Sequence, residues 1–181
     1  MHQDYFYHYK LSPELTNQFK LDVDAAVGKS KLPPLDPTVL DISTVGGLQH
    51  HLMEPVITPM IDTVIETVKD IITDSLILDR TKLHLASAWT VYGEKGAYHT
   101  IHRHNDNDDI CTVIYLDVEP EPVPQKHGTF VYWYENKLNL FGPEDGDILI
   151  FPAKTWHGTY PQTADKRHTL NLDFRYERSY F

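Results

Sequence analysis

The sequence contains very little cysteine and no long hydrophobic run. Cys111 is the only cysteine among 181 residues, so neither an internal disulfide nor a cysteine-rich zinc site can form. No apolar run approaches the roughly 20 residues that span a bilayer. The opening residues, MHQDYFYHYK, lack the apolar segment of a signal peptide. We therefore expect a cytoplasmic protein without a membrane segment.

Basic residues are also scarce. The chain has 16 lysines and arginines against 26 acidic residues, and its formal net charge is -10. This balance makes nucleic acid an unlikely partner, because phosphate backbones attract basic surfaces. Hydrophobic residues make up 41% and charged residues 23%, as in ordinary globular proteins. The length favours one domain over residues 1–181.

Helix signals are confined to the first 80 residues. Ser12 suits the N-cap of a helix, Pro13 its first position and Glu14 the positive end of its dipole. A second helix is expected from about Glu54 to Ser75, because apolar residues recur there at three- and four-residue steps. These residues are Val56, Ile57, Met60, Ile61, Val64, Ile65, Val68, Ile71 and Ile72.

After Arg80 the sequence changes to short β-branched and aromatic runs separated by turn residues. The runs are KLHLASAWTVY, CTVIYLDV, GTFVYWYE, GDILIFPA and RHTLNLDFRY. The absence of helical segments between them excludes parallel βαβ units and indicates an antiparallel sandwich or barrel. We expect a helical buttress over residues 1–80 and a β core over 81–181.

The stretch IHRHNDNDDI, residues 101–110, predicts a metal site. Alternate strand positions share a face, so His102, His104 and Asp106 could point the same way. His157, in FPAKTWHGTYP, could supply a distant ligand. Two histidines and one carboxylate leave half of an octahedron open, which non-haem Fe(II) uses for a co-substrate and O₂.

The run RHTLNLDFRY alternates between a polar and a largely apolar face. Arg167, Thr169, Asn171 and Asp173 share one face, which could be a solvent-facing edge or the lining of a site. The planar fork of arginine is suited to binding a carboxylate. This alternative points to an anionic ligand near the metal.

These motifs together resemble the Fe(II)/2-oxoglutarate-dependent oxygenase superfamily. The stretches GAYHTIHRHNDND, TVIYLD, GDILIFPAKTWHGTYP and RHTLNLDF are similar to small prolyl-hydroxylase-like members and related oxygenases of bacteria and phages. The resemblance implies a double-stranded β-helix, or jelly roll, similar to the cupins. It also implies that Arg167, Thr169 and Tyr115 bind the far carboxylate of 2-oxoglutarate.

Two ligand sets remain open. We favour His104, Asp106 and His157, because an anionic ligand suits a ferrous centre and because Asn105-Asp106 begins a turn, as in family members. The alternative replaces Asp106 with His102 and gives a three-histidine site, as in some cupin-type dioxygenases. In the favoured set His102 becomes a neighbour of the metal or faces the substrate.

Several aromatic and charged residues are candidates for the substrate side. They are His102, Trp89, Tyr92, Tyr98 and Arg103, for which core packing or solvent exposure is the alternative. YGEKGAY, residues 92–98, has the glycines of a mobile lid. His99 and His127 lie near glycines and are expected on the surface.

The resemblance implies a hydroxylase that uses Fe(II), 2-oxoglutarate and O₂ and releases succinate and CO₂. Its expected substrate is an unactivated C–H bond of an amino acid or a peptidyl, prolyl-type residue, by analogy alone. The alternatives are a three-histidine cupin-like dioxygenase or isomerase, and a β-sandwich binding module without activity. Neither the substrate nor the oligomeric state follows from the sequence.

Overall fold

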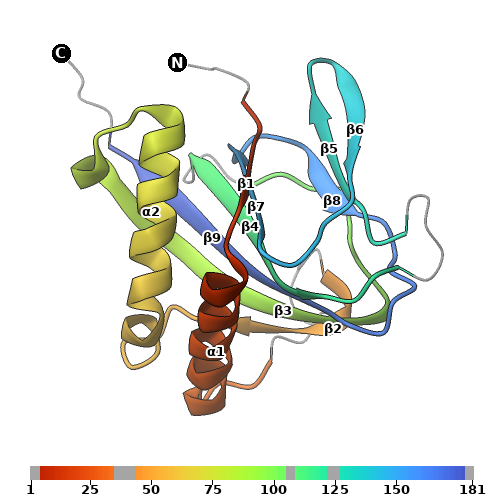
Figure 1. The fold of residues 1–181 in the computed structure, drawn as a ribbon, viewed down its shortest axis with the longest axis horizontal. Helices are drawn as coiled ribbons and strands as arrows, with labels where there is room; N and C mark the ends of the chain where they lie inside the picture. Colours follow the sequence, from red (N-terminus) through yellow and green to blue (C-terminus); the bar gives the residue numbers. More distant parts are fainter. Residues whose placement is uncertain (1–4, 35–43, 105–108, 122–126, 178–181) are drawn as a thin grey trace.

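Two antiparallel sheets and two helices make up the fold in a computed structural model, which describes residues 5–34, 44–104, 109–121 and 127–177. Asp106 and Asp108 lie outside these ranges. The larger sheet has the order β1-β7-β4-β9-β3-β2 and the smaller one the order β6-β5-β8 (Figure 1). In chain order the strands are Tyr7–Lys10, Thr44–His51, Leu83–His99, Ile110–Val118, Phe130–Tyr134, Lys137–Phe141, Asp147–Pro152, His157–Thr159 and Arg167–Tyr176 (β1–β9).

The larger sheet separates two different interiors, because strand side chains alternate between its faces. Its outer face packs on the helices, as Figure 1 shows. On β9 this face carries Leu170, Leu172 and Phe174, all fully buried. The inner face looks into the jelly roll, where Tyr115 of β4 and Phe151 of β7 belong to a second, smaller cluster. The expected mostly-β jelly roll with N-terminal helices is confirmed.

Helix α1, Pro13–Lys29, begins as the sequence predicts. The hydroxyl of Ser12 accepts a hydrogen bond from the backbone N–H of Leu15 at 3.2 Å, and Pro13 occupies the first turn. Phe19, Val23 and Ala26 are buried in the main core. The cap therefore sets where the helix begins, and its buried side chains attach it to the sheet.

Helix α2, Asp62–Leu76, begins later than expected. A short 3₁₀ turn, η1 (Thr58–Ile61), precedes it, and Val56 is 75% exposed instead of joining the apolar stripe. Proline 59 cannot donate the backbone hydrogen bond of a helix interior, so it sits in the first turn of the 3₁₀ segment. No helix among the described residues is both long and apolar enough to cross a membrane.

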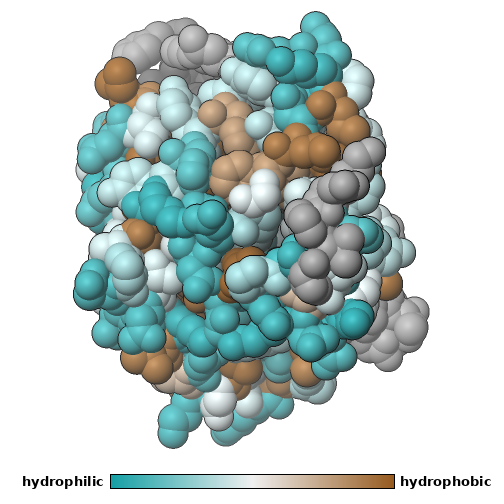
Figure 2. All heavy atoms as spheres, turned by 45° about the vertical axis from the view of Figure 1, so that its right-hand side comes forward, coloured by the Kyte–Doolittle hydropathy of each residue, from teal (hydrophilic) through white to brown (hydrophobic). Residues whose placement is uncertain are grey.

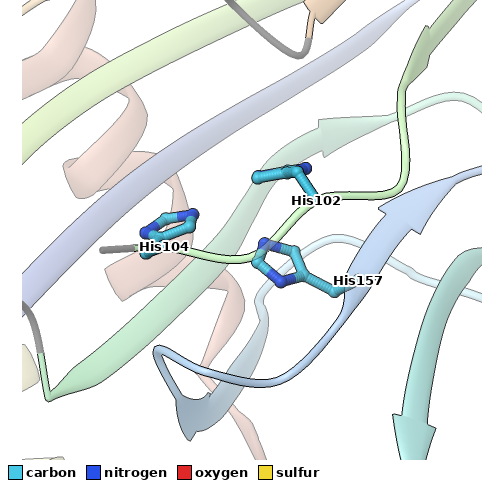
Figure 3. A group of neighbouring side chains, drawn as sticks. All are labelled: His102, His104 and His157. Atoms are coloured by element: carbon cyan, nitrogen blue, oxygen red, sulfur yellow. The ribbon is translucent and has the colours of Figure 1, made fainter. Parts of the chain in front are cut away.

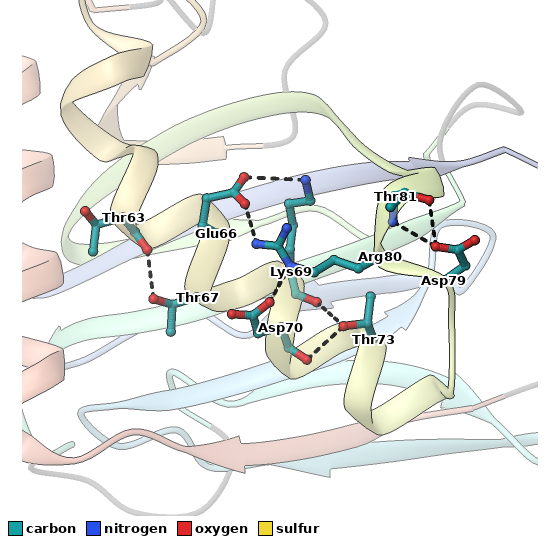
Figure 4. A network of polar contacts seen from close by, with 9 residues as sticks. All are labelled: Thr63, Glu66, Thr67, Lys69, Asp70, Thr73, Asp79, Arg80 and Thr81. Carbon is teal, nitrogen blue, oxygen red and sulfur yellow. Dashed lines mark hydrogen bonds and ion pairs between the residues drawn. The ribbon is translucent and has the colours of Figure 1, made fainter.

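A polar network joins α2 to the start of β3 (Figure 4). Arg80, in the 3₁₀ segment η2 (Arg80–Lys82), contacts the carboxylates of Glu66 and Asp70 on the exposed side of α2. Lys69 pairs with Glu66 at 3.4 Å. These ion pairs hold the turn that leads from the helix into the sheet.

Three expectations differ from the structure in detail. The first 80 residues also supply β1 and β2, which are edge strands of the larger sheet. Residues 92–98 belong to β3, where Tyr92, Gly93 and Tyr98 pair with β2 and the register shifts between Gly93 and Tyr98, so the expected lid is a bulged part of a strand. The strands β6 and β8 were also missed, because one is largely exposed and the other is only three residues long.

Candidate metal centre and adjoining pocket

Three histidines meet where two segments of the chain are bridged. His102 and His104 follow the end of β3, and His157 begins β8. The backbone N–H of His102 donates to the carbonyl of His157 at 2.8 Å, and the reverse bond measures 2.9 Å. Gly158 allows this approach, since a Cβ there would lie 2.8 Å from the carbonyl oxygen of His99. The glycine of the WHG sequence is thus a packing requirement of the site.

The three imidazoles form a cluster of metal-binding size. One ligand atom from each of His102, His104 and His157 lies within 4.8 Å of the other two. The ring centroids of His102 and His157 are 4.3 Å apart, and those of His104 and His157 are 5.1 Å apart. Figure 3 shows the three side chains gathered around one space. Imidazole nitrogens suit iron, zinc, copper or nickel.

A hydrogen-bond acceptor lies at Nδ1 of each ring. His102 Nδ1 is 2.8 Å from the carbonyl of Thr100, and His157 Nδ1 is 2.8 Å from that of Thr155. His104 Nδ1 is 2.8 Å from Oδ2 of Asp173. A neutral histidine that donates from Nδ1 presents Nε2 as an electron-pair donor. This tautomer and outer contact are typical of histidines that bind metals.

The surroundings favour the neutral form of His102 and His157. Burial lowers the pKa of His157 well below its usual value, and the neighbouring His102 and His104 lower it further. Burial also lowers the pKa of His102. Neutral histidine is the form that binds a metal ion, so the site is prepared for a cation near neutral pH.

The structure brings together the alternative ligand set. His104 and His157 are common to both sets, and His102 lies with them. Asp106, the carboxylate of the favoured set, lies outside the described residues. The choice between His102 and Asp106 as third ligand therefore stays a prediction.

The polar face of β9 is buried and lines a pocket beside the histidines. Arg167, Thr169, Asn171 and Asp173 all border this pocket, together with Tyr115 from the neighbouring strand β4. They are at most 7% exposed, because β9 lies in the middle of the larger sheet. The interpretation of this face as a solvent-exposed edge is therefore wrong.

Arg167 and Tyr115 bring hydrogen-bond donors to the pocket that the described residues do not fully satisfy. Arg167 donates to the carbonyl of Gly128 at 3.0 Å and to the hydroxyl of Thr159 at 3.4 Å. No carboxylate among the described residues lies within salt-bridge distance of it, although a guanidinium stays charged in proteins. The buried hydroxyl of Tyr115 has no hydrogen-bond partner in the described part of the chain. Burial raises its pKa, so it remains a donor. An anion with several oxygens would satisfy both groups.

The substrate-side candidates divide between two places. Trp89 and Tyr98 line the pocket, and the ring centroid of Trp89 is 5.9 Å from that of His104. Tyr92 does not line it, because its ring stacks on His168 at 4.1 Å and its hydroxyl donates to Asp24 of α1. Arg103 is exposed and does not line the pocket, and its guanidinium lies 5.2 Å from the ring centroid of Trp156.

The two histidines expected on the surface also differ. His127 is exposed, as expected, and its Nδ1 lies 3.4 Å from the carbonyl of Pro161. His99 instead lines the pocket, where its Nε2 is 3.2 Å from the hydroxyl of Thr44. Burial lowers the pKa of His99 to about 3, and the positive charge of Arg167 contributes. His99 ends β3 and faces inward, whereas the nearby glycine had suggested an exposed loop.

An apolar groove continues outward from the pocket. Tyr98, His99 and Thr159 line both. Half of the side chain of Trp133 and of Trp156 is exposed beside this groove, at 50% and 48%. The other residues that line it are Thr100, Ile101, Val131, Leu138, Tyr160 and Pro161. Figure 2 shows apolar side chains gathered on the side of the molecule that carries the hairpin of β5 and β6.

Comparison with known proteins places this geometry in a known fold. No family model matches the chain, and neither does any curated protein. A prolyl-4-hydroxylase from Pseudomonas putida is similar in structure, with a TM-score of 0.67, 16% identity and coverage of 96% of this chain and 93% of that one. A viral collagen prolyl hydroxylase from Paramecium Bursaria Chlorella virus-1, solved with 2-oxoglutarate, is also similar. Its TM-score is 0.65 at 15% identity, over 96% of this chain and 97% of that one.

A third similar structure is HygX from Streptomyces hygroscopicus, solved with nickel and 2-oxoglutarate bound. Its TM-score is 0.68 at 11% identity, over 93% of this chain and 82% of that one. At such identities the likeness establishes the fold. The chain thus has the jelly-roll fold of the 2-oxoglutarate–Fe(II) oxygenases and prolyl hydroxylases.

Proposed function

We propose that this protein is a non-haem Fe(II)- and 2-oxoglutarate-dependent dioxygenase that hydroxylates an unactivated C–H bond and releases succinate and CO₂. One observation carries the proposal. A cluster of three histidines and a buried arginine without a carboxylate partner among the described residues face the same pocket. A 2-oxo dicarboxylate has a group for each, since its keto-acid end binds metals and its far end is an anion.

The donors fit a divalent iron. His104 and His157 would hold it, with Asp106 or His102 as the third ligand, and the remaining positions would stay open. Bound iron would supply the activation of O₂ for attack on the C–H bond. The chain's own part is to orient the imidazoles through Nδ1, and to bury His157 beside Phe130 and Phe151.

Arg167 would bind the far carboxylate of 2-oxoglutarate. Its planar fork can donate two parallel hydrogen bonds, and Tyr115 can donate a third from the adjacent strand. Thr169 lies opposite Tyr115 in the pairing of β4 with β9, so its hydroxyl is placed to help. Because all three side chains are buried, these bonds form in a site of low dielectric constant, where they are strong.

The decisive experiment compares wild-type protein with Arg167→Ala. A charge-assisted contact contributes roughly 1.5–3 kcal/mol, and a decade of affinity corresponds to about 1.4 kcal/mol. Arg167→Ala should therefore raise the 2-oxoglutarate concentration for half-maximal succinate formation at least about tenfold, with iron content unchanged. Arg167→Lys should recover part of this loss, because a point charge cannot replace the fork.

Arg80→Ala is the matched control, since Arg80 lies on the far side of the molecule beside α2. It should leave the 2-oxoglutarate dependence unchanged. If the wild-type iron form does not bind 2-oxoglutarate, or if Arg167→Ala binds it equally well, the oxygenase proposal fails.

The substrate that we propose is an amino-acid side chain within a peptide, of the prolyl type. The aromatic groove supports this, because extended proline-rich segments bind between exposed aromatic rings. Among the similar structures, a prolyl hydroxylase from Trichoplax adhaerens is in complex with a peptide fragment of hypoxia inducible factor. Proline-containing peptides should stimulate succinate formation more than free proline at equal concentration. Equal stimulation by both would contradict a peptide substrate.

A second candidate is a three-histidine, cupin-like dioxygenase or isomerase that needs no keto acid. The cluster of His102, His104 and His157 favours it, because one ligand atom of each lies within 4.8 Å of the other two. The two functions differ in their use of 2-oxoglutarate and of Asp106. Metal retained in Asp106→Ala but lost in His102→Ala, with no binding of 2-oxoglutarate, would support the cupin-like function.

A further inference from the structure

We propose that Asp173 is a positioning residue that holds His104 in the orientation and tautomer needed to bind the metal ion. This inference rests on the metal site of the proposed function. Asp173 was noted in the sequence only as part of the polar face of β9. Its place in the structure gives it a separate role beside the ligands.

Asp173 is held at the meeting point of three strands. It lies on β9, opposite Ser87 of β3 on one side and Cys111 of β4 on the other. Its Oδ2 is 2.8 Å from Nδ1 of His104 and accepts a hydrogen bond from the hydroxyl of Ser87 at 3.0 Å. The thiol of Cys111 is 3.2 Å from the same Nδ1. The carboxylate is the stronger acceptor, because it carries the charge.

The carboxylate of Asp173 is buried and only partly satisfied by the described residues. The residue is 2% exposed, and no lysine or arginine among the described residues lies within salt-bridge distance of it. Its second oxygen, Oδ1, has no hydrogen-bond partner in the described part of the chain. A buried charge in this state is costly. A divalent ion on the other nitrogen of His104 would compensate it through the imidazole.

Asp147 shows what a buried aspartate with a purely structural role looks like in this protein. It is also 2% exposed and also contacts a histidine, with Oδ1 2.8 Å from Nε2 of His8. Unlike Asp173, it has a cation, since Lys10 lies 3.0 Å away, and its Oδ2 accepts from the backbone of Glu144 at 2.7 Å. Both oxygens of Asp147 are therefore satisfied within the chain, whereas Oδ1 of Asp173 has no partner among the described residues.

A carboxylate at Nδ1 acts on the metal through the ring. It fixes the proton on Nδ1, directs Nε2 toward the ion and makes Nε2 more basic. Replacing such partners typically weakens metal binding about 10- to 100-fold. The same loss is not expected from a residue that only supports the fold.

The test is metal binding by the whole protein, measured without turnover. Fe(II) under anaerobic conditions and Co(II) in air are titrated into wild type, Asp173→Asn and the control Asp147→Asn. We expect Asp173→Asn to bind both ions about 10- to 100-fold more weakly and to change the visible spectrum of the Co(II) form. Asp147→Asn should keep the wild-type metal affinity and spectrum, even if its thermal stability falls.

A second measurement uses only the wild-type protein and so does not depend on the folding of a variant. In the zinc-loaded protein with ¹⁵N-labelled histidine, His104 should carry its proton on Nδ1 and the metal on Nε2. The opposite tautomer, or unchanged affinity and spectrum in Asp173→Asn, would overturn the role of Asp173 and leave the proposed function intact. Failure of wild type to bind any divalent ion would overturn both.

Discussion

The two faces of the larger sheet are built for different purposes. The outer face of β9 presents Leu170, Leu172 and Phe174 to the helices, and all three are fully buried among apolar neighbours. The inner face of the same strand presents Arg167 and Asp173 to the pocket, equally hidden from solvent. One strand thus supports a sealed core on one side and a polar chamber on the other.

The difference lies in how well buried polar groups are satisfied. On the inner face Tyr115, Asn171 and Asp173 each have a buried side-chain atom without a hydrogen-bond partner in the described residues. Such atoms cost free energy in a finished core, and native proteins keep few of them. Because these three residues border one pocket, we infer that a ligand completes the inner face. On the outer face of β9, Nδ1 of His168 is the one such atom among the described residues.

The largest expected effect comes from a substitution that disrupts only the metal site on the inner side of the larger sheet. His157→Ala should abolish stoichiometric Fe(II) binding and all 2-oxoglutarate turnover, because it removes a ligand common to both proposed sets. The circular dichroism spectrum should stay that of wild type, since His157 belongs to a three-residue strand of the smaller sheet. Metal analysis of the purified variant provides the measurement. Full turnover would contradict the ligand assignment.

Parallel variants then identify the third ligand. His102→Ala and Asp106→Ala are compared under the same conditions, and the one that loses metal marks the residue that completes the site. Loss in Asp106→Ala alone would support the histidine–carboxylate set, and loss in His102→Ala alone would support the three-histidine set.

The next largest effect comes from a substitution that disrupts only the apolar core on the outer face. Phe174→Ala removes a fully buried aromatic ring from the core under the helices. Such truncations cost about 3–5 kcal/mol of unfolding free energy. Metal affinity per folded molecule should nevertheless remain within a few-fold of wild type. Chemical denaturation followed by metal titration at low temperature measures both. A loss of metal affinity as large as in Asp173→Asn would contradict the separation of the two faces.

The smallest expected effect concerns His168, which is the exception to the apolar outer face of β9. His168 is a polar residue on the outer face, where it contacts the hydroxyl of Thr90 and stacks on Tyr92. Burial lowers its pKa from 6.5 to about 4, although Asp24 acts in the opposite direction. The folded state thus keeps this imidazole neutral between pH 6.5 and 4, whereas the unfolded chain binds a proton. Stability therefore falls as pH falls through this window.

The size of this dependence follows from the pKa difference, at about 1.4 kcal/mol for each pH unit. Metal-free wild type should lose up to about 3 kcal/mol more stability than His168→Gln between pH 6.5 and 4. Urea denaturation at several pH values measures this. Identical slopes for the two proteins would show that His168 is not buried as a neutral group.

Much of the fold could be predicted because local signals agreed with the tertiary structure. Ser12 and Pro13 marked a helix start that forms as expected. The alternating run from Arg167 to Tyr176 marked the whole of β9. The strand β2, by contrast, contains Gly46 and Gly47, and its register shifts there, so its pattern resembles a loop. Short or glycine-rich edge strands are defined by the partners they pair with, which the local sequence does not contain.

The site was partly predictable for the same reason. His104, His157 and Arg167 stand out by residue type and spacing, and the structure brings them to one pocket. Asp173 carried a weaker signal, a charge on a buried strand three positions before its end. Its role depends on Ser87 and His104, which reach it only through the pairing of strands far apart in the sequence. Tyr92 illustrates the opposite case. It lies three positions after Trp89 in β3, so strand alternation places it on the other face, where its hydroxyl donates to Asp24.

The central position of β9 has a consequence for how the protein can assemble as it is made. β4, β7 and β1 form one group of paired strands and β3 and β2 another, and within the described residues β9 alone joins the two groups in one sheet. At about 5–20 residues per second, several seconds of synthesis separate β3 from β9. During that interval the inward edges of β3 and β4 have no strand to pair with, and open edges invite wrong pairing. Chaperone dependence and aggregation should therefore respond most to whatever delays the arrival of residues 167–176.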